Sequence, residues 1–169
     1  NTFASSRNQQ NLENLRNSFI NAYLSWQYVE MFDIGLAEET YYKSKMNIYP
    51  TTVSRIELNI QNGNADFNNS NNYAAQGFPA LDYLLYGIEN SDELILSKFN
   101  NEPQYLTYLS NVINQMLQNT YPIVEDWQNY RNPFIGSVRN TATSSVNKMT
   151  NDFIYYYEKG FRANKFGIP

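Results

Sequence analysis

The side chains that could do chemistry in this sequence are carboxylates, lysines and tyrosines, because its 169 residues include no His and no Cys. The absence of Cys removes thiol nucleophiles, disulfides and thiolate metal sites. The absence of His removes the commonest general base near neutral pH and the commonest zinc ligand. A Ser-His-Asp triad is therefore impossible within the chain, and catalysis would need acids, lysines, tyrosines or residues of another chain.

Paired carboxylates are the first candidates for acid and base chemistry, which requires two of them to face one substrate. Three pairs occur, but their members are adjacent in sequence, and neighbouring helical residues point about 100° apart. Solvated surface acids are therefore the favoured interpretation. The Asn-rich stretch from Asp66 to Asn72 lacks the ordered acidic spacing of a calcium loop and is interpreted as a polar loop. The three pairs are Glu38 and Glu39, Asp92 and Glu93, and Glu125 and Asp126.

Composition indicates one globular domain over residues 1–169, with 42% hydrophobic and 16% aromatic residues. The net charge of −4 argues against nucleic acid as a partner. No apolar run approaches the roughly 20 residues that span a bilayer. No signal peptide is visible at Asn1-Thr2-Phe3, a start that fits either a cytosolic chain or one cut after a leader.

Apolar residues recur three and four positions apart through most of the chain, which is typical of amphipathic helices. No stretch alternates by two, as a strand requires. The sequence therefore predicts an all-α fold, an up-and-down bundle of about four main helices. The positions expected in its core are Leu15, Phe19, Ala22, Trp26, Val53, Ile56, Leu81, Leu84, Leu85, Leu109, Ile113, Met116, Val146, Met149 and Phe153.

Proline, glycine and capping residues predict where these helices end. Pro79 is tolerable only in a first helical turn or at a kink, and Pro122 is expected to bend or end a long helix that opens at Pro103. Asn132-Pro133 predicts a loop. The expected helices are a first one with its stripe from Leu12 to Val29, a piece over 36–46, short helices from Val53 to Ile60 and over 73–87, a start at 91–93, the long helix from Pro103 with Leu106 and Leu117 on its buried side, and a last one from Val146 to Gly160 that stops at 165–169.

The segment from Gln76 to Gly87 resembles the Gly-x-His-x-x-Glu signature of the imelysin family, read in the context Gly-Phe-His-Ala-x-Glu-Tyr-Leu-Leu. The packing residues of that signature are present, while the His position holds Pro79 and the Glu position holds Asp82. The matching residues are Gly77, Phe78, Ala80, Tyr83, Leu84 and Leu85.

Other motifs follow in the family's order. Leu15-Arg16 with Trp26 resembles its first helix, Phe32-Asp33-Ile34-Gly35 its Phe-x-x-Gly turn, Ile48-Tyr49-Pro50 its Trp-Pro, and Lys165 to Pro169 its Lys-Leu-Gly-Ile-Pro stretch. The resemblance covers nearly the whole chain. It implies the first half of a protein built from two helical bundles.

The resemblance also implies a metal ion in the full-length protein, held at a groove between the bundles. Pro79 cannot ligate a metal, and Asp82 is about 1.5 Å shorter in reach than Glu, against ligand tolerances of ~0.2 Å. Asp82 is thus a candidate metal ligand by position, with a polar helix carboxylate as the favoured interpretation. No catalytic residue is assigned, and the chain alone is not expected to bind a metal tightly. Aromatic candidates for a groove wall are Trp26, Tyr49 and Tyr83.

The leading interpretation is a non-catalytic binding module of a bacterial cell-envelope protein, in the setting of iron or nutrient uptake that the resemblance implies. The alternatives are a metal-dependent peptidase whose ligands come mainly from the second half, and a purely structural helical bundle. The expected partner is a second bundle of the same protein or a separate fragment. The Tyr155–Tyr157 run supports this, since three consecutive rings cannot all face one core. The expected location is the periplasm or the outer membrane, with membrane association through a lipid anchor that this chain does not contain.

Overall fold

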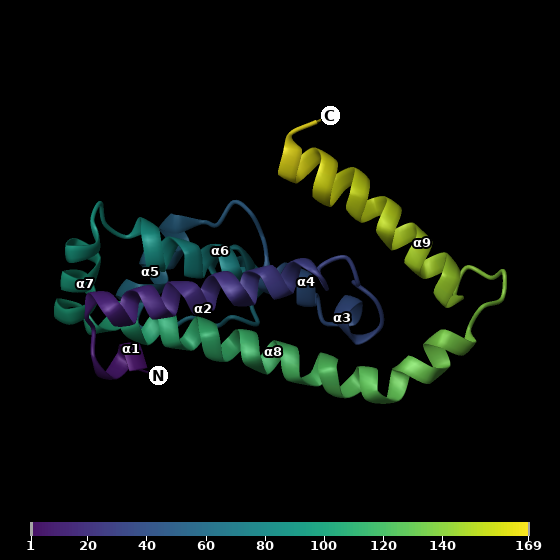
Figure 1. Cartoon of the computed structure of the whole chain (residues 1–169), viewed down its shortest axis with the longest axis horizontal. Helices are drawn as coiled ribbons and strands as arrows, with labels where there is room; N and C mark the ends of the chain where they lie inside the picture. The colour runs from purple at the N-terminus through teal and green to yellow at the C-terminus, as the bar shows by residue number, and fades with distance from the viewer. Residues whose placement is uncertain (1, 169) are drawn as a thin grey trace. The chain divides into compact units, whose positions relative to one another are not determined.

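The computed structural model describes residues 2–168, and these form helices and their connections with no strand among them (Figure 1). The all-α prediction is confirmed. Helices α1 to α9 are joined by a 3-10 helix, η1, and two π-helical segments, η2 and η3. In order they are α1 Thr2–Ser5, α2 Gln9–Gln27, α3 Leu36–Glu39, α4 Tyr42–Met46, α5 Val53–Asn62, η1 Ser70–Ala75, α6 Gly77–Asp82, η2 Tyr83–Gly87, α7 Asp92–Asn101, α8 Pro103–Gly136, α9 Ser145–Tyr155 and η3 Tyr156–Lys165.

The helices group into two compact units. The first unit combines the chain up to Ser25 with Lys43–Asn119, and the second combines Trp26–Tyr42 with the residues from Thr120 onward. The long helices α2 and α8 each contribute one part to each unit. The expectation of a single domain over residues 1–169 stays a prediction.

The first unit has a well-buried core drawn from all its main helices. Phe3 of α1 meets Phe99 of α7 edge to face, with ring centroids 5.3 Å apart. Of the predicted core positions in this unit, Leu84 is fully buried and five others have 8% exposure or less, two of them 0%. The five are Ile56, Leu81, Leu85, Leu109 and Met116. Burial of such side chains is the main driving force for folding the unit.

Three positions on the apolar stripes of this unit were predicted wrongly. On α2, Ala22 is exposed and Tyr23 takes its place, since the larger ring packs against Phe78 at 5.2 Å. Val53 is 40% exposed because it is the first residue of α5, ahead of the buried Ile56. Leu117 of α8 is 47% exposed, while its neighbour Met116 faces inward.

The predicted helix over 73–87 is wrong as one element, because it is divided into η1, α6 and η2. Gln76 is extended and Gly77, the first residue of α6, has a φ of +75°, so no helix runs continuously from η1 into α6. Pro79 lies in the first turn of α6, as predicted, where its missing N–H costs nothing. The predicted piece over 36–46 is likewise divided into α3 and α4, and Tyr41 between them has a φ of +55°.

In the second unit, α8 continues through Pro122 and Pro133 to Gly136. The loop predicted at Asn132-Pro133 and a helix end at Pro122 are therefore wrong, while the bend at Pro122 stays a prediction. Both prolines are exposed, and so are the residues four positions earlier. The carbonyls that each ring leaves unpaired can therefore bond to water, which lowers the cost of a proline inside a helix. The helix places Trp127 and Phe134 edge to face at 5.4 Å.

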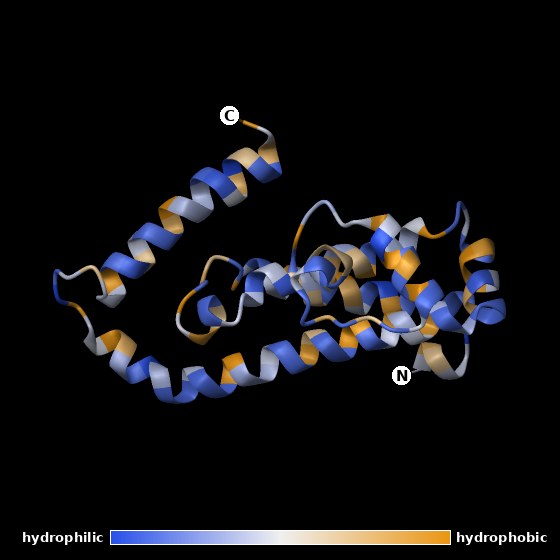
Figure 2. Ribbon diagram, turned by 180° about the vertical axis from the view of Figure 1, so that it is seen from behind, coloured by the Kyte–Doolittle hydropathy of each residue, from blue (hydrophilic) through white to orange (hydrophobic). Residues whose placement is uncertain are grey.

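The last helices of the second unit carry apolar residues on more than one side (Figure 2). Phe153 of α9 meets Phe32 edge to face at 5.5 Å, whereas Val146, predicted in the core, is 51% exposed because it lies in the first turn of α9. η3 ends at Lys165, and Gly167 follows it with a φ of +63°, in line with the predicted helix stop. Pro169, the last residue of that predicted signal, lies outside the described residues.

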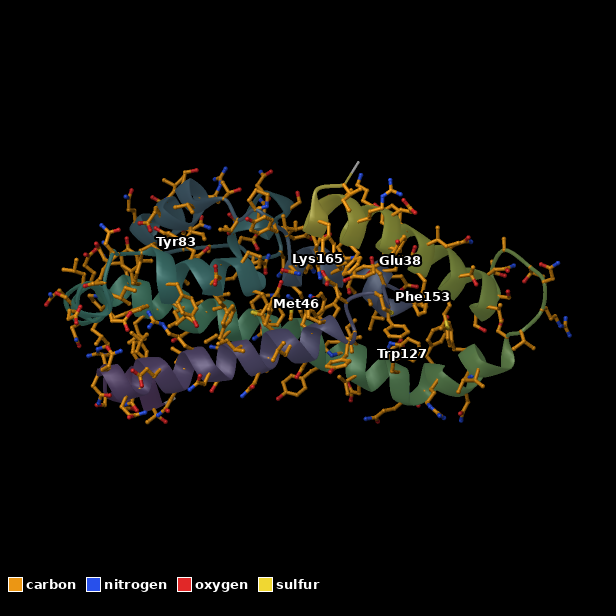
Figure 3. The ribbon with its side chains drawn as sticks, turned by 45° about the horizontal axis from the view of Figure 1, so that its top comes forward. Glu38, Met46, Tyr83, Trp127, Phe153 and Lys165 are labelled. Carbon is orange, nitrogen blue, oxygen red and sulfur yellow. The ribbon has the colours of Figure 1, made fainter. Side chains whose placement is uncertain are left out.

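Hydrogen bonds between polar side chains attach η3 to the rest of the second unit. The ammonium of Lys165, labelled in Figure 3, donates to Gln27 Oε1 at 2.6 Å, to Glu30 Oε2 at 2.8 Å and to the Tyr156 hydroxyl at 3.1 Å. Glu30 is only 5% exposed. A carboxylate that is so strongly buried needs such a cationic partner to stay charged.

Candidate functional site

The signature segment begins at a point where only glycine fits. A Cβ on Gly77 would lie 2.2 Å from the carbonyl oxygen of Met46 and 2.9 Å from that of Lys45, at the end of α4. Together with the positive φ, this close approach excludes any other residue without movement of α4 or α6. Gly77 therefore fixes the start of α6 against the end of α4.

Phe78 anchors the same turn from the other side. It is 5% exposed and packs against Phe19, at 6.3 Å between ring centroids, and against Tyr23, at 5.2 Å. Both rings come from α2, so the signature helix is fixed to α2 by aromatic packing. The packing residues that match the family's signature thus have a clear structural role.

The two altered positions of the signature do not converge on a site. Pro79 is half-buried and Asp82, one turn later, is exposed. Partial desolvation still raises the pKa of the Asp82 carboxyl. Within residues 2–168 there is no group of three or more acids placed to hold a metal ion, and the carboxylate of Asp82 makes no hydrogen bond or ion pair in that range.

Tyr83, the next residue, opens the π-helical turn η2 and points at a carboxylate of α5. Its hydroxyl donates to Glu57 Oε1 at 2.6 Å, and the hydroxyl of Tyr105 on α8 donates to Glu57 Oε2 at 2.5 Å. Each oxygen of the Glu57 carboxylate therefore accepts one hydrogen bond from a tyrosine hydroxyl. We call Glu57, Tyr83 and Tyr105 the carboxylate–diphenol cluster.

Burial and charge both hold the two phenols of this cluster in their neutral form. Tyr105 is 5% exposed, and Glu57 and Tyr83 are half-buried. Burial, followed by the hydrogen bond and the charge of Glu57, raises the pKa of Tyr83 and of Tyr105 far above its ordinary value. The phenols thus act as hydrogen-bond donors at any physiological pH.

Further charged groups surround the cluster. Lys98 of α7 lies over the ring of Tyr105, 4.8 Å from its centroid, and pairs with Glu89 at 3.2 Å and with Glu102 at 3.5 Å. The charge of Lys98 is thus neutralised by Glu89 and Glu102. Within the described residues Glu57 has no ion pair, so its charge is met by phenols alone.

Arg16 of α2 holds the far end of the π-helical turn. Its guanidinium donates to the Leu85 carbonyl from both Nε and Nη2, and to both oxygens of Asp92 at 2.9 and 2.7 Å. It also lies over the ring of Tyr86, 4.5 Å from the centroid. These charge-assisted contacts connect α2 to the π-helical turn.

The predicted groove residues have different surroundings. Trp26 is 4% exposed and lies against Tyr42 in the second unit, with ring centroids 5.6 Å apart. Tyr49 of the first unit is 83% exposed, and Tyr83 belongs to the cluster. A groove lined by them stays a prediction. Sequence reasoning missed Glu57 and Tyr105; the only signal for them was their place beside the buried stripes of α5 and α8.

Comparison with known proteins decides the relationship. The family model described as imelysin matches residues 1–167. The chain belongs to the imelysin family. No curated protein and no solved structure gave a match. The resemblance inferred from the ordered motifs is confirmed by this match.

The imelysin signature implies a metal ion, and the donors at its two ligand positions do not fit one. The side chain of Pro79 offers no donor atom, and Asp82 offers a single exposed carboxylate. One carboxylate without an imidazole is a poor site for a transition metal. No step through such a metal is therefore derived for this chain. No helix within residues 2–168 is both long and apolar enough to cross a membrane.

Proposed function

We propose that this imelysin-family chain is a non-catalytic binding module associated with iron or nutrient uptake. One observation carries the proposal: the signature segment keeps its packing residues and has lost its ligands. Gly77 and Phe78 still fix α6 against α4 and α2, whereas Pro79 and Asp82 offer no ligand set. The segment therefore supports a scaffold for binding better than it supports metal catalysis.

The cellular setting is part of the proposal and follows from family membership. The module would act at the bacterial cell envelope, in the periplasm or at the outer membrane, with membrane association through a lipid anchor outside this sequence. Localisation of an epitope-tagged protein by cell fractionation tests this. Recovery in the cytosolic fraction alone would contradict it.

The partner in this proposal is a second helical bundle, from the same polypeptide or a separate fragment. Its support is the number of exposed apolar side chains on the last helices of the second unit. Tyr157 and Phe161 stack at 6.3 Å, and Phe161 meets Phe166 at 4.7 Å, yet all three rings are at least 39% exposed. Exposed apolar groups of this kind mark interaction surfaces, and a stable interface would bury more than ~1,000 Å². Analytical ultracentrifugation of the chain, with and without the second bundle, tests this proposal. A chain that stays monomeric when the second bundle is added would contradict it.

Metal titration and a peptidase assay test the absence of family-type chemistry. Calorimetric titration of the purified chain with Zn²⁺ and Fe²⁺ should give no sub-micromolar binding, and peptide hydrolysis should not exceed the blank. Sub-micromolar binding that disappears in Asp82→Ala would overturn the proposal. Activity that appears only when the second bundle is added would instead support the metal-dependent peptidase.

A further inference from the structure

We propose that the pair between Glu30 and Lys165 sets the orientation of η3, so that the polar side of this segment faces its own unit and the aromatic side faces outward. The inference deepens the proposed function, on which it rests, because an outward aromatic side is the surface that the second bundle would bind. Lys165 is the last residue of η3 and is labelled in Figure 3.

The side of η3 that faces the unit is polar. No residue of η3 is buried. The hydroxyl of Tyr156 donates to Glu30 Oε2 at 3.1 Å, and the ammonium of Lys165 donates to the same oxygen at 2.8 Å. The ammonium also donates to Gln27 Oε1 at 2.6 Å. Because Tyr156 and Lys165 are the first and last residues of η3, these contacts attach both of its ends.

The aromatic side of η3 faces away from the unit. Tyr157 and Phe161 are 56% and 39% exposed, and Phe166, directly after η3, is 62% exposed. The three rings contact one another, with successive centroids 6.3 and 4.7 Å apart. A surface helix usually turns its apolar side toward the core and its polar side toward water. The orientation of η3 is therefore the reverse of the usual one.

The buried charge of Glu30 gives a physical reason for this reversal. Glu30 is 5% exposed, and Lys165, with a side chain that is 31% exposed, pairs with it. If η3 turned its aromatic side inward, the ammonium of Lys165 would leave the carboxylate. A buried charge that loses its partner is strongly unfavourable. Buried polar groups are known to fix the register of helices at some cost in stability, and this pair would fix an orientation in the same way.

An exposed ion pair within η3 offers a matched control. Arg162 donates to Glu158, four residues earlier, at 2.8 Å, and the two side chains are 38% and 51% exposed. This pair joins two residues of η3 to each other, and exposed pairs of this kind contribute little to stability. Its loss should therefore leave the orientation of η3 unchanged.

Amide hydrogen exchange of the purified chain, followed by mass spectrometry, gives the first test. Lys165→Met removes the charge and keeps a long side chain, so exchange across η3 should become faster by more than ~10-fold. Glu30→Gln should act in the same direction, whereas Arg162→Met should change the rate by less than ~3-fold. Unchanged exchange across η3 in the charge-removing variants of Glu30 and Lys165 would overturn the inference. If Glu30→Gln does not fold, Lys165→Met carries this test.

Binding of the second bundle distinguishes a role in orientation from simple attachment. Glu30→Leu combined with Lys165→Met replaces the pair by apolar side chains, a change that is often neutral or stabilising. If the pair sets the orientation, the double variant should stay folded and yet bind the second bundle more than ~10-fold more weakly in analytical ultracentrifugation. Natural affinity in the double variant would show that the pair only attaches η3, and it would overturn the inference.

The two tests also separate this inference from the proposed function. A natural chain that does not bind the second bundle would contradict the proposed partner, while faster exchange in Lys165→Met would still support the role of the pair in holding η3. A natural chain that binds the second bundle, with exchange across η3 unchanged in Lys165→Met and Glu30→Gln, would contradict this inference alone.

Discussion

The guanidinium of Arg16 donates two hydrogen bonds to the carbonyl oxygen of Leu85, at 3.1 and 2.8 Å, across 69 residues of sequence. This relationship ties α2 to the π-helical turn that carries Tyr83. Because the side chain of Arg16 is only 14% exposed, these bonds are shielded from water. The stability of the first unit should therefore depend on this side chain.

Arg16→Ala should lower the free energy of unfolding by about 2–3 kcal/mol, since it leaves the Leu85 carbonyl and Asp92 without their charged partner. Urea denaturation measures the change. Arg16→Lys is the matched control and should recover only part of the loss, because an ammonium cannot make the paired contact with Asp92. Full recovery by lysine would show that charge alone matters.

The pair between Arg16 and Asp92 should also make stability depend on pH. The hydrogen bond from Arg16, and then that from Gln9, hold the pKa of Asp92 below its ordinary value. A lowered folded pKa contributes stability that is present above the unfolded value of about 3.9 and is lost as the pH falls through the folded pKa. The difference in urea midpoint between the natural chain and Asp92→Asn should therefore be constant near neutral pH and shrink below about pH 4. A difference that does not change with pH would contradict this assignment.

Gly77→Ala should destabilise the first unit more than Gly63→Ala does. Both glycines have a positive φ, of +75° and +67°, so both substitutions cost about 1–2 kcal/mol of backbone strain. Only at Gly77 does the new methyl group meet a carbonyl, 2.2 Å away, whereas nothing lies within 4 Å at Gly63. Thermal or urea unfolding of the two variants gives the comparison, and equal losses would show that the approach to Met46 is easily relieved.

Leu84→Ala should cost about 2–5 kcal/mol, because the side chain is fully buried and its removal leaves a cavity. Leu94→Ala, at a position 49% exposed in the same unit, should change stability by less than about 0.5 kcal/mol. Urea denaturation of both variants measures these values. A small loss at Leu84 would indicate that its neighbours close the cavity.

Helical spacing predicted most elements, but it could not choose between neighbours on a stripe. Ala22 and Tyr23 both fit the three-and-four pattern of α2. Tyr23 faces the core because its ring is large enough to pack against Phe78. Nor could local rules foresee that α8 continues past Pro122 and Pro133, since a proline on an exposed face keeps its cost low. Both errors come from tertiary contacts or solvent exposure, which no single helix encodes.

The signature segment was recognised from sequence because its residues are contiguous, and the carboxylate–diphenol cluster was not because its residues are scattered. Tyr83 lies 26 residues from Glu57, and Tyr105 lies 48 residues from it. No spacing rule joins positions so far apart. Only the packing of α5, η2 and α8 brings their oxygens together.

The π-helical turn makes the aim of Tyr83 depend on the number of residues in that turn. A π-turn holds more residues per turn than the 3.6 of an α-helix. Deleting one residue between Leu84 and Gly87 would let the turn close as ordinary α-helix, and it would change the directions of the groups within the turn. The Tyr83 hydroxyl could then no longer reach Glu57 while the Leu85 carbonyl accepts from Arg16. The number of residues in this turn is therefore a constraint on the sequence that is separate from the identity of its side chains.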